Sequence, residues 1–377
     1  MTDTSDIYVV DADGHVIEPP DMWQEYLEAR YRASAPRPVL DEDGTFCYAV
    51  GDGLVMRTAS RLGDRPEAIP GEDDFPAELN PGGWDAAARM VDMDGEGIDL
   101  SFLYPTVGLF LPELPDLELH AALCRAYNNW LHDYCQTAPD RLMGVALLPL
   151  NDVDMSIREL ERCTKDLGFR GAFIRPNPYG GLPVQHPRYE PFWDCVESLG
   201  IPVTVHEGMA DTLPTLGRDR SANPAIRHLM CHPFEQMAAC AGLILGGVLE
   251  RHPGLRFVFL ESGCGWLPYW LERMDGHFGN WSHHLHGVKH KPSEYFQRQC
   301  FISMDPDDEG APSVLEQVGD ECMVWASDYP HTDHPFPGVI KSTLDILARA
   351  PAGTPNKVLS TNALRLYDLE LPAKARA

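Results

Sequence analysis

Short apolar segments recur along the chain, and longer segments with helical spacing of apolar residues separate them. The short runs are β-branched or uniformly apolar, which is typical of strands that are buried on both faces of a parallel sheet. Eight such runs are found, at residues 7–11, 100–104, 143–148, 171–175, 202–206, 256–260, 301–304 and 323–326. Eight strands that alternate with helices predict an α/β fold, the (β/α)8 TIM barrel.

The helical segments between these runs support the same architecture. Amphipathic spacing predicts helices at 84–96, 117–138, 154–167, 190–199, 225–251, 266–277 and 312–318, with an eighth after Pro337. A chain of 377 residues with 44% hydrophobic and 23% charged residues is able to bury a large core. We therefore expect residues 1–377 to form one barrel domain.

Residues 29–83 interrupt the repeating pattern after the first strand. This stretch is rich in Pro, Gly and Asp and is too long for an ordinary loop between a strand and a helix. Loops that follow barrel strands cover the active-site face, so the insertion is expected to act as a lid or pocket wall, or alternatively as a dimerisation arm. Within it, residues 47–57 (CYAVGDGLVMR) predict a small hairpin. Residues 283–291 form a second insertion, expected to be a solvated loop.

Charge and composition exclude several classes of function. The 30 Lys and Arg against 57 Asp and Glu give a net charge of -27, which repels phosphate backbones and anionic lipids. We expect a small-molecule substrate and neither nucleic acid nor membrane as a partner. The first residues resemble no secretory signal, and no apolar run reaches the ~18 residues that span a bilayer. Ten Cys without C-x-x-C spacing fit reduced thiols, so a cytoplasmic location is expected.

Four potential metal ligands follow the predicted strands. The first strand ends in Asp11-Ala-Asp13-Gly-His15, where residues two apart project to the same side. His206 ends the fifth strand, and Asp328 follows the eighth. Functional groups of TIM barrels lie at the C-terminal ends of several strands, so these nitrogen and oxygen donors are expected to meet there and bind a metal ion.

Several segments together resemble the amidohydrolase-2 family, which includes enzymes like aminocarboxymuconate-semialdehyde decarboxylase. The resemblance covers residues 7–369 and is carried by DADGHVIEP, GGWDAAARMVDMDGEGID, AYNNWLHDYC, DRLMGVALLPL, LGFRGAFIRPNP, GIPVTVHEG, LGGVLERHPGLRFVFLESGCGWLPYWLERMD and WASDYPH. It implies a metal-dependent TIM-barrel enzyme, from a family of hydrolases and non-oxidative decarboxylases. It also implies a homodimer.

The resemblance places the family's ligands on Asp13, His15, His206 and Asp328. Asp13 stands where the family's first imidazole is expected. This extra carboxylate hardens the site and moves its preference from Zn²⁺ toward Mn²⁺ or Fe²⁺. We expect one divalent transition metal, zinc first, with manganese or iron as alternatives.

Other residues near the strand ends have two interpretations each. Ser262 stands where the family has a histidine after the sixth strand, and the adjacent Glu261 is a base, a further ligand, or an anchor for the strand end. His232 is a ligand or proton shuttle, or else a buried residue at the start of a helix. Glu18 reaches the ion or, as we prefer, positions the loop.

Arg175 and His331 are the expected substrate contacts. Arg175 ends the fourth strand, where related barrels hold a bridging lysine, and a guanidinium cannot be carbamylated, so one ion is expected rather than two. Arg175 either clamps a substrate carboxylate or pairs with a neighbouring acid. His331 follows Asp328 by three residues and is expected to contact the substrate or support the ligand.

These features favour hydrolysis as the reaction. A metal-activated water would attack an amide, ester, lactone or acyl thioester, and Asp328, His232 or Glu261 would handle the proton. The alternative is non-oxidative decarboxylation of an aromatic or unsaturated acid, in which a side chain protonates carbon. A third hypothesis is an inactive barrel that binds a partner.

Overall fold

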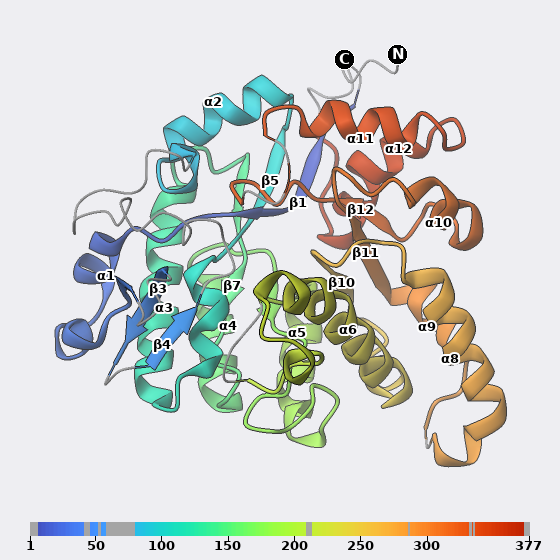
Figure 1. Ribbon diagram of the computed structural model, residues 1–377, viewed down its shortest axis with the longest axis horizontal. Coiled ribbons are helices and arrows are strands. Elements are labelled where there is room, and N and C mark those ends of the chain that lie inside the picture. Colours follow the sequence, from blue (N-terminus) through green and yellow to red (C-terminus); the bar gives the residue numbers. More distant parts are fainter. Residues whose placement is uncertain are drawn as a thin grey trace.

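The computed structural model describes residues 7–40, 46–51, 54–57, 80–208, 213–285, 287–331, 334 and 336–372. At its centre lies a parallel sheet that curves around on itself (Figure 1). Its strands are β1 (Val10–His15), β5 (Leu100–Tyr104), β6 (Leu142–Gly144), β7 (Ala146–Leu147), β8 (Ala172–Ile174), β9 (Val203–Val205), β10 (Phe257–Phe259), β11 (Cys300–Met304) and β12 (Met323–Trp325).

Backbone hydrogen bonds close this sheet into a barrel. β6 and β7 form one interrupted strand around Val145, whose N–H donates to Leu103 while the Ala146 N–H donates to Gly171. At the other seam, the segment after β12 meets β1, because the Asp328 N–H donates to the Asp13 carbonyl and the His15 N–H to the Tyr329 carbonyl. The predicted eight-stranded α/β barrel is confirmed.

The strand ends agree closely with the sequence prediction, except in the first strand. β5 spans the predicted residues, and every other predicted run except the first differs by no more than about one residue at either end. β1 begins at Val10 and extends to His15, with a register irregularity between Asp11 and Gly14. Asp13 and His15 thus belong to the strand itself.

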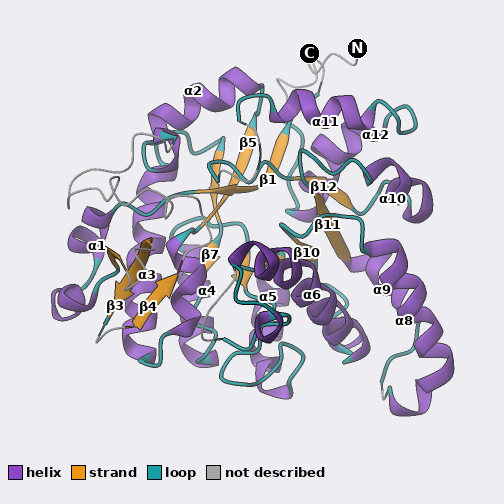
Figure 2. Ribbon diagram, in the orientation of Figure 1, coloured by secondary structure: helices purple, strands orange, loops and turns teal. Residues whose placement is uncertain are grey.

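Helices lie around the outside of the barrel (Figure 2). The main ones are α2 (Ala86–Glu96), α3 (Leu117–Cys135), α4 (Val153–Lys165), α5 (Glu190–Leu199), α6 (Pro224–Leu245), α8 (Leu267–Trp281), α9 (Pro292–Gln299), α10 (Ala311–Val318) and α11 (Val339–Leu347). Shorter helices are α1 (Pro20–Tyr26), α7 (Val248–Arg251), α12 (Thr354–Asn356) and α13 (Asn362–Leu366). The predicted helix at 225–251 is two helices, because Gly247 adopts a φ of 78° between α6 and α7.

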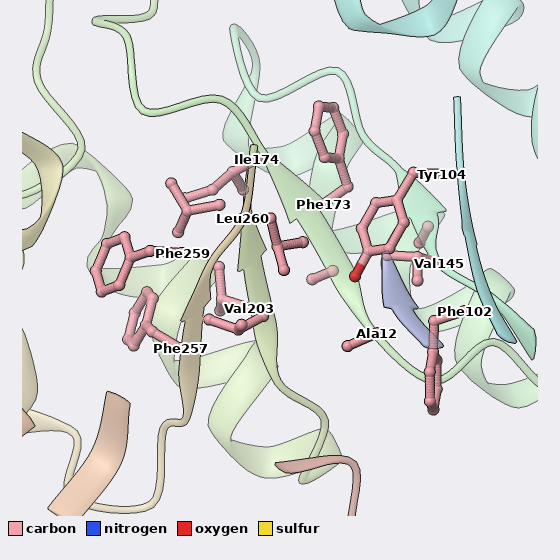
Figure 3. Close-up of a cluster of buried hydrophobic side chains, with 14 of the residues drawn as sticks. Ala12, Phe102, Tyr104, Val145, Phe173, Ile174, Val203, Phe257, Phe259 and Leu260 are labelled. Atoms are coloured by element: carbon pink, nitrogen blue, oxygen red, sulfur yellow. The ribbon is translucent and has the colours of Figure 1, made fainter. Parts of the chain in front are cut away.

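Apolar side chains fill the space between the strands and around them (Figure 3). Phe102 of β5 stacks on Tyr367 with ring centres 3.4 Å apart, and the Tyr367 hydroxyl lies 2.8 Å from that of Tyr104. All ten cysteines are free thiols, nine of them buried, as the sequence predicts.

The insertion after β1 holds a small antiparallel sheet. Its strands are β2 (Arg37–Leu40), β3 (Phe46–Val50) and β4 (Leu54–Arg57), and the pairing of β3 with β4 confirms the predicted hairpin. Residues 58–79 of the insertion lie outside the described residues, so its role as lid or dimer arm stays a prediction. Within the described ranges, no helix is both long enough and apolar enough to cross a membrane.

Candidate metal centre

The first strand brings a carboxylate and an imidazole to the top of the barrel. Asp13 and His15 are both fully buried. The Nδ1 of His15 lies 2.9 Å from the carbonyl oxygen of Pro105, which only accepts a hydrogen bond. Nδ1 therefore carries the proton of the neutral ring, and the lone pair of Nε2 faces the centre of the site.

His206 presents its ring in the same way from the end of β9. Its Nδ1 lies 2.5 Å from the Glu207 carbonyl oxygen, so its Nε2 also faces the centre. The two Nε2 atoms are only 3.1 Å apart. Two acceptor atoms at this distance repel one another unless a positive charge lies between them, which is the arrangement of ligands around a metal ion.

Carboxylates complete the donor set. Asp13 Oδ1 lies 3.4 Å from His15 Nε2, and Asp13 Oδ2 lies 3.4 Å from His206 Nε2. Asp328 Oδ1 lies 3.5 Å from His15 Nε2. Both Asp13 oxygens and Asp328 Oδ2 are buried and have no hydrogen-bond partner among the described residues. Buried carboxylate oxygens without donors are costly unless they coordinate a cation, so these four side chains fit a divalent ion.

Glu261 joins the cluster from the end of β10. Its Oε2 lies 3.0 Å from His206 Nε2, and its Oε1 lies 3.4 Å from His232 Nε2. Although burial disfavours the charged carboxylate, His232 and His206 hold the pKa of Glu261 well below its usual range. Burial also disfavours a charged His206, but Asp13 and Glu261 raise the pKa of this imidazole well above its usual value. Both shifts reflect the attraction between the imidazoles and the carboxylates of this cluster.

The backbone at two of these carboxylates is unusual. Glu261 has a φ of 47° and Asp328 a φ of 54°. Non-glycine residues rarely adopt such values, and where they do, the surrounding structure imposes them, most often at functional sites. Each of the two residues follows the end of a barrel strand, where the left-handed turn directs the carboxylate toward the imidazoles.

A second layer of contacts holds the ligands in place. His331 Nδ1 lies 2.7 Å from Asp328 Oδ1, and its Nε2 lies 2.9 Å from the hydroxyl of Thr106. The fully buried Glu18 accepts hydrogen bonds from the N–H groups of 106, 107 and 108. Glu18 thus fixes the loop that supplies the Pro105 carbonyl to His15 and Thr106 to His331, which is the positional role preferred from the sequence.

Arg175 is engaged within the protein. It is fully buried, its Nη2 donates to Glu207 over 2.6 Å, its Nη1 to the Leu109 carbonyl and its Nε to Asn177. Of the two roles considered for Arg175, the structure shows the ion pair with a neighbouring acid. A clamp on a substrate carboxylate would require breaking this buried pair, so we do not retain Arg175 as a substrate contact.

One other expectation from the sequence needs correction. Asp11 does not project beside Asp13 and His15, because the register irregularity in β1 turns it toward Ser327 and Ser101, which donate hydrogen bonds to it. Ser262 accepts a hydrogen bond from the indole of Trp266.

Two residues of the site escaped the sequence analysis. His228 lies one helical turn before His232 on α6, and their ring centres are 4.1 Å apart. Glu207, the partner of Arg175, also lies 4.0 Å from His232. The His-x-x-x-His spacing was visible in the sequence and places both rings on one helix face. Glu207 carried no such signal, because a carboxylate beside a strand-end histidine is commonplace.

A cavity of about 590 Å³ lies on the same face of the barrel. It is lined by the loops after β8 and β9 and by α6, including Pro176, Pro214, Leu216 and Glu235. Burial raises the pKa of Glu235 to about 7. The volume is within the range of small-molecule pockets.

Comparison with known proteins identifies the family. The family model described as amidohydrolase matches residues 10–369. The chain belongs to the amidohydrolase family. The resemblance predicted from its motifs is confirmed, and this amidohydrolase is an enzyme of that superfamily with a divalent-metal site.

Most of the curated relatives of this amidohydrolase are named as decarboxylases, and one is named as a 2-keto-4-carboxy-3-hexenedioate hydratase. A gamma-resorcylate decarboxylase of Rhizobium radiobacter is 28% identical over 75% of this chain and 86% of its own length. A 2-amino-3-carboxymuconate-6-semialdehyde decarboxylase of Dictyostelium discoideum is 25% identical, over 78% and 80% respectively. The expectation of a hydrolase is therefore wrong. The motifs are shared across the family and do not distinguish the two reactions.

Solved structures support the fold. An amidohydrolase from Mycobacterium avium subsp. paratuberculosis matches 96% of this chain and 99% of its own with a TM-score of 0.75 at 22% identity. A dihydroxybenzoic acid decarboxylase from Polaromonas, solved with bound manganese and 2-nitroresorcinol, covers 98% of this chain and 99% of its own with a TM-score of 0.69 at 19% identity. Both confirm the barrel architecture for this amidohydrolase.

Proposed function

We propose that this amidohydrolase is a divalent-metal-dependent, non-oxidative decarboxylase of an aromatic or unsaturated carboxylic acid. The observation that carries the proposal is the pair of Nε2 atoms of His15 and His206, turned toward one another among unpartnered carboxylate oxygens. The relatives named as decarboxylases, which match three quarters of the chain, favour this reaction. Hydroxybenzoates are the first substrate class to test, because gamma-resorcylate is one.

In the proposed site, Asp13, His15, His206 and Asp328 hold the ion. Held by these side chains, a divalent ion would supply a positive charge for the carboxylate of the acid and a neighbouring oxygen. The carbon–carbon bond to the departing carboxylate breaks, its electron pair stays on the ring carbon, and CO₂ leaves. A proton must then reach that carbon from the protein.

Asp328 and His331 are the proposed source of the proton. Their side chains are linked over 2.7 Å, and His331 is 18% exposed whereas Asp328 is 1% exposed. His331 can therefore take a proton from solvent and pass it to the buried Asp328, which is oriented by its strained backbone toward the ion ligands. The loop anchored by Glu18 places Thr106 against His331 and so helps to hold His331 beside Asp328.

The identity of the ion and the partners are further parts of the proposal. Two carboxylates and two imidazoles suit Mn²⁺ as well as Zn²⁺, and the manganese in the Polaromonas structure favours Mn²⁺ over the zinc expected first. We also propose a homodimer in which residues 29–83 serve as lid or arm, to be tested by light scattering of the full chain and of a variant without residues 58–79.

The deciding experiment loads chelator-treated protein with Mn²⁺ or Zn²⁺ and incubates it with a panel of hydroxybenzoates and unsaturated acids. Release of CO₂ with the matching decarboxylated product supports the proposal. Activity should disappear in His15→Asn and His206→Asn variants, and His283→Asn, an exposed histidine away from the site, serves as the control. Metal-loaded protein that releases no CO₂ from any acid of the panel would refute it.

A further inference from the structure

The site contains more negative charge than a single divalent ion neutralises. Asp13, Asp328 and Glu261 are three carboxylates that lie within 3.5 Å of the Nε2 atoms of His15 and His206. The two buried arginines beside the cluster are already engaged, because Arg175 pairs with Glu207 and Arg89 donates to the His15 carbonyl and to Ser101. With one divalent ion the cluster still carries an excess negative charge, and an acid substrate would add another. Buried excess charge of this kind is costly, so a cation beside Glu261 would stabilise the cluster.

Two imidazoles converge on the far side of Glu261. His232 Nε2 lies 3.4 Å from Glu261 Oε1, and His228 Nε2 lies 3.9 Å from the same oxygen. These donor atoms of His228, His232 and Glu261 all lie within 4.8 Å of one another. The two histidines are four residues apart on α6, which is the helical spacing used for a pair of metal-binding imidazoles.

The tautomer of His232 supports coordination. Its Nδ1 lies 3.3 Å from the His228 carbonyl oxygen, which accepts a hydrogen bond, and 3.4 Å from Cys231 Sγ. With the proton on Nδ1, the lone pair of Nε2 points to Glu261. Protonating both rings would place two imidazolium ions with centres 4.1 Å apart, which is electrostatically unfavourable. One cation shared by the two neutral rings supplies the missing charge without that repulsion.

We propose that His228, His232 and Glu261 form a second divalent-cation site, and that Glu261 bridges it to the first. Two imidazoles and a carboxylate suit Mn²⁺, Fe²⁺ or Zn²⁺. The side chain of His228 is 34% exposed, so the remaining coordination positions are open to water or to an anionic group of the substrate. The expectation of a single ion rested on the missing lysine after β8, whereas Glu261 supplies a different bridge.

This second site extends the proposed function and rests on it in one respect. The Glu261 carboxylate is shared with the first ion. The test is a Mn²⁺ titration of the chelator-treated full chain, read by elemental analysis after dialysis and by electron paramagnetic resonance. Wild-type protein should bind about two equivalents, whereas His228→Asn and His232→Asn should each bind about one. The resonance of wild type should broaden as the second equivalent binds, because two manganese ions bridged by a carboxylate are magnetically coupled.

Controls separate this site from the first and from a proton-shuttling role of His232. His283→Asn should bind as wild type does, and His15→Asn should lose the first ion while it retains the second. Circular dichroism establishes that each variant is folded, and His228, which is partly exposed, is the safer substitution. Saturation of the wild type at one equivalent, or wild-type stoichiometry in His232→Asn, would overturn the second site. CO₂ release measured on the same samples tests the decarboxylase proposal independently.

Discussion

The contact between His331 and Asp328 links a buried proposed ligand to a partly exposed imidazole. Replacing His331 by Gln should lower kcat by roughly 10²–10⁴-fold, the usual contribution of a positioned proton donor. The metal content should be unchanged, because His331 is not among the proposed ligands. The measurement is kcat alongside elemental analysis of the same sample.

Thr106→Val is the matched comparison for His331. It removes the contact between the ring and the Thr106 hydroxyl, and the hydrogen bond that this hydroxyl donates to the Val16 carbonyl, and it leaves the pair with Asp328 intact. Its effect on kcat should be clearly smaller. An equal loss in both variants would mean that the contact with Thr106, rather than the link to Asp328, accounts for the effect of His331, and a kcat close to wild type in His331→Gln would rule out the proton route.

Replacing Glu18 tests the hydrogen bonds that hold the loop beside the proposed ligand His15. Glu18→Gln preserves the shape but turns donor hydrogens of the amide toward backbone N–H groups, so unfolding free energy should fall by about 1–3 kcal/mol. Affinity for Mn²⁺ should fall as well, because the same loop orients His15. Urea unfolding of chelator-treated protein and a Mn²⁺ titration measure the two effects.

The control for Glu18 is Glu25→Gln on the exposed face of α1. It should change neither the free energy of unfolding nor the metal affinity. If Glu18→Gln destabilises the fold and binds Mn²⁺ with full affinity, the loop does not orient His15.

Individual residues were predictable from sequence where a strand fixes their direction. Asp13, His15, His206 and Asp328 follow strands of a parallel barrel, so their convergence follows from topology. Residues whose partners lie on other loops were not predictable. The pairing of Arg175 with Glu207, and of Glu18 with the 105–108 loop, depends on backbone paths that no periodicity describes.

At the scale of the element, helix α3 carries a histidine that should make the free energy of unfolding depend on pH. His120 is fully buried, neither ring nitrogen has a hydrogen-bond partner among the described residues, and burial lowers its pKa to about 3. The unfolded chain gains a proton as pH falls through about 6.5, whereas the folded protein does not, so stability is lost from there downward.

His120→Leu should remove this dependence. Between about pH 7.5 and pH 5, the variant should lose about 2 kcal/mol less unfolding free energy than wild type, at 1.36 kcal/mol per pKa unit. Urea titrations at the two pH values measure the difference. His277→Leu, on the exposed face of α8, should retain the wild-type slope. Parallel losses in His120→Leu and wild type would show that other groups dominate acid unfolding.

Elements were predicted well where the pattern is long or uniformly apolar, and less well at their ends. β5 and α5 match the predicted residues, because turn residues bound them on both sides. The first strand was displaced because Asp11 and Asp13 are polar residues inside a strand, which tertiary pairing with β5 overrides. α9 was missed because its eight residues are too few to establish a period.

At the scale of the whole molecule, the ion should stabilise the closure of the barrel, where β1 meets the segment after β12. Its proposed ligands come from β1, β9 and the segment after β12, and β1 meets that segment through only a few backbone hydrogen bonds. An ion present at 100 to 1,000 times its Kd should raise unfolding free energy by about 3–4 kcal/mol. Unfolding with chelator, with Mn²⁺ and after re-addition measures this stabilisation.

His15→Asn is the control for this stabilisation by the ion. Its stabilisation by Mn²⁺ should be clearly smaller than that of wild type, since the first ion loses an imidazole. If chelation leaves the wild-type transition unchanged, the ion does not hold the seam together.

The position of the seam has a consequence for the synthesis of the protein. The ligands are encoded near the start, the middle and the end of the chain. At typical translation rates, the segment with Asp13 and His15 leaves the ribosome roughly tens of seconds before Asp328 does. A nascent chain thus has an incomplete ligand set throughout elongation. We therefore expect the ion to be acquired only once Asp328 has joined the other proposed ligands, so its identity should depend on the ions available to the nearly complete barrel.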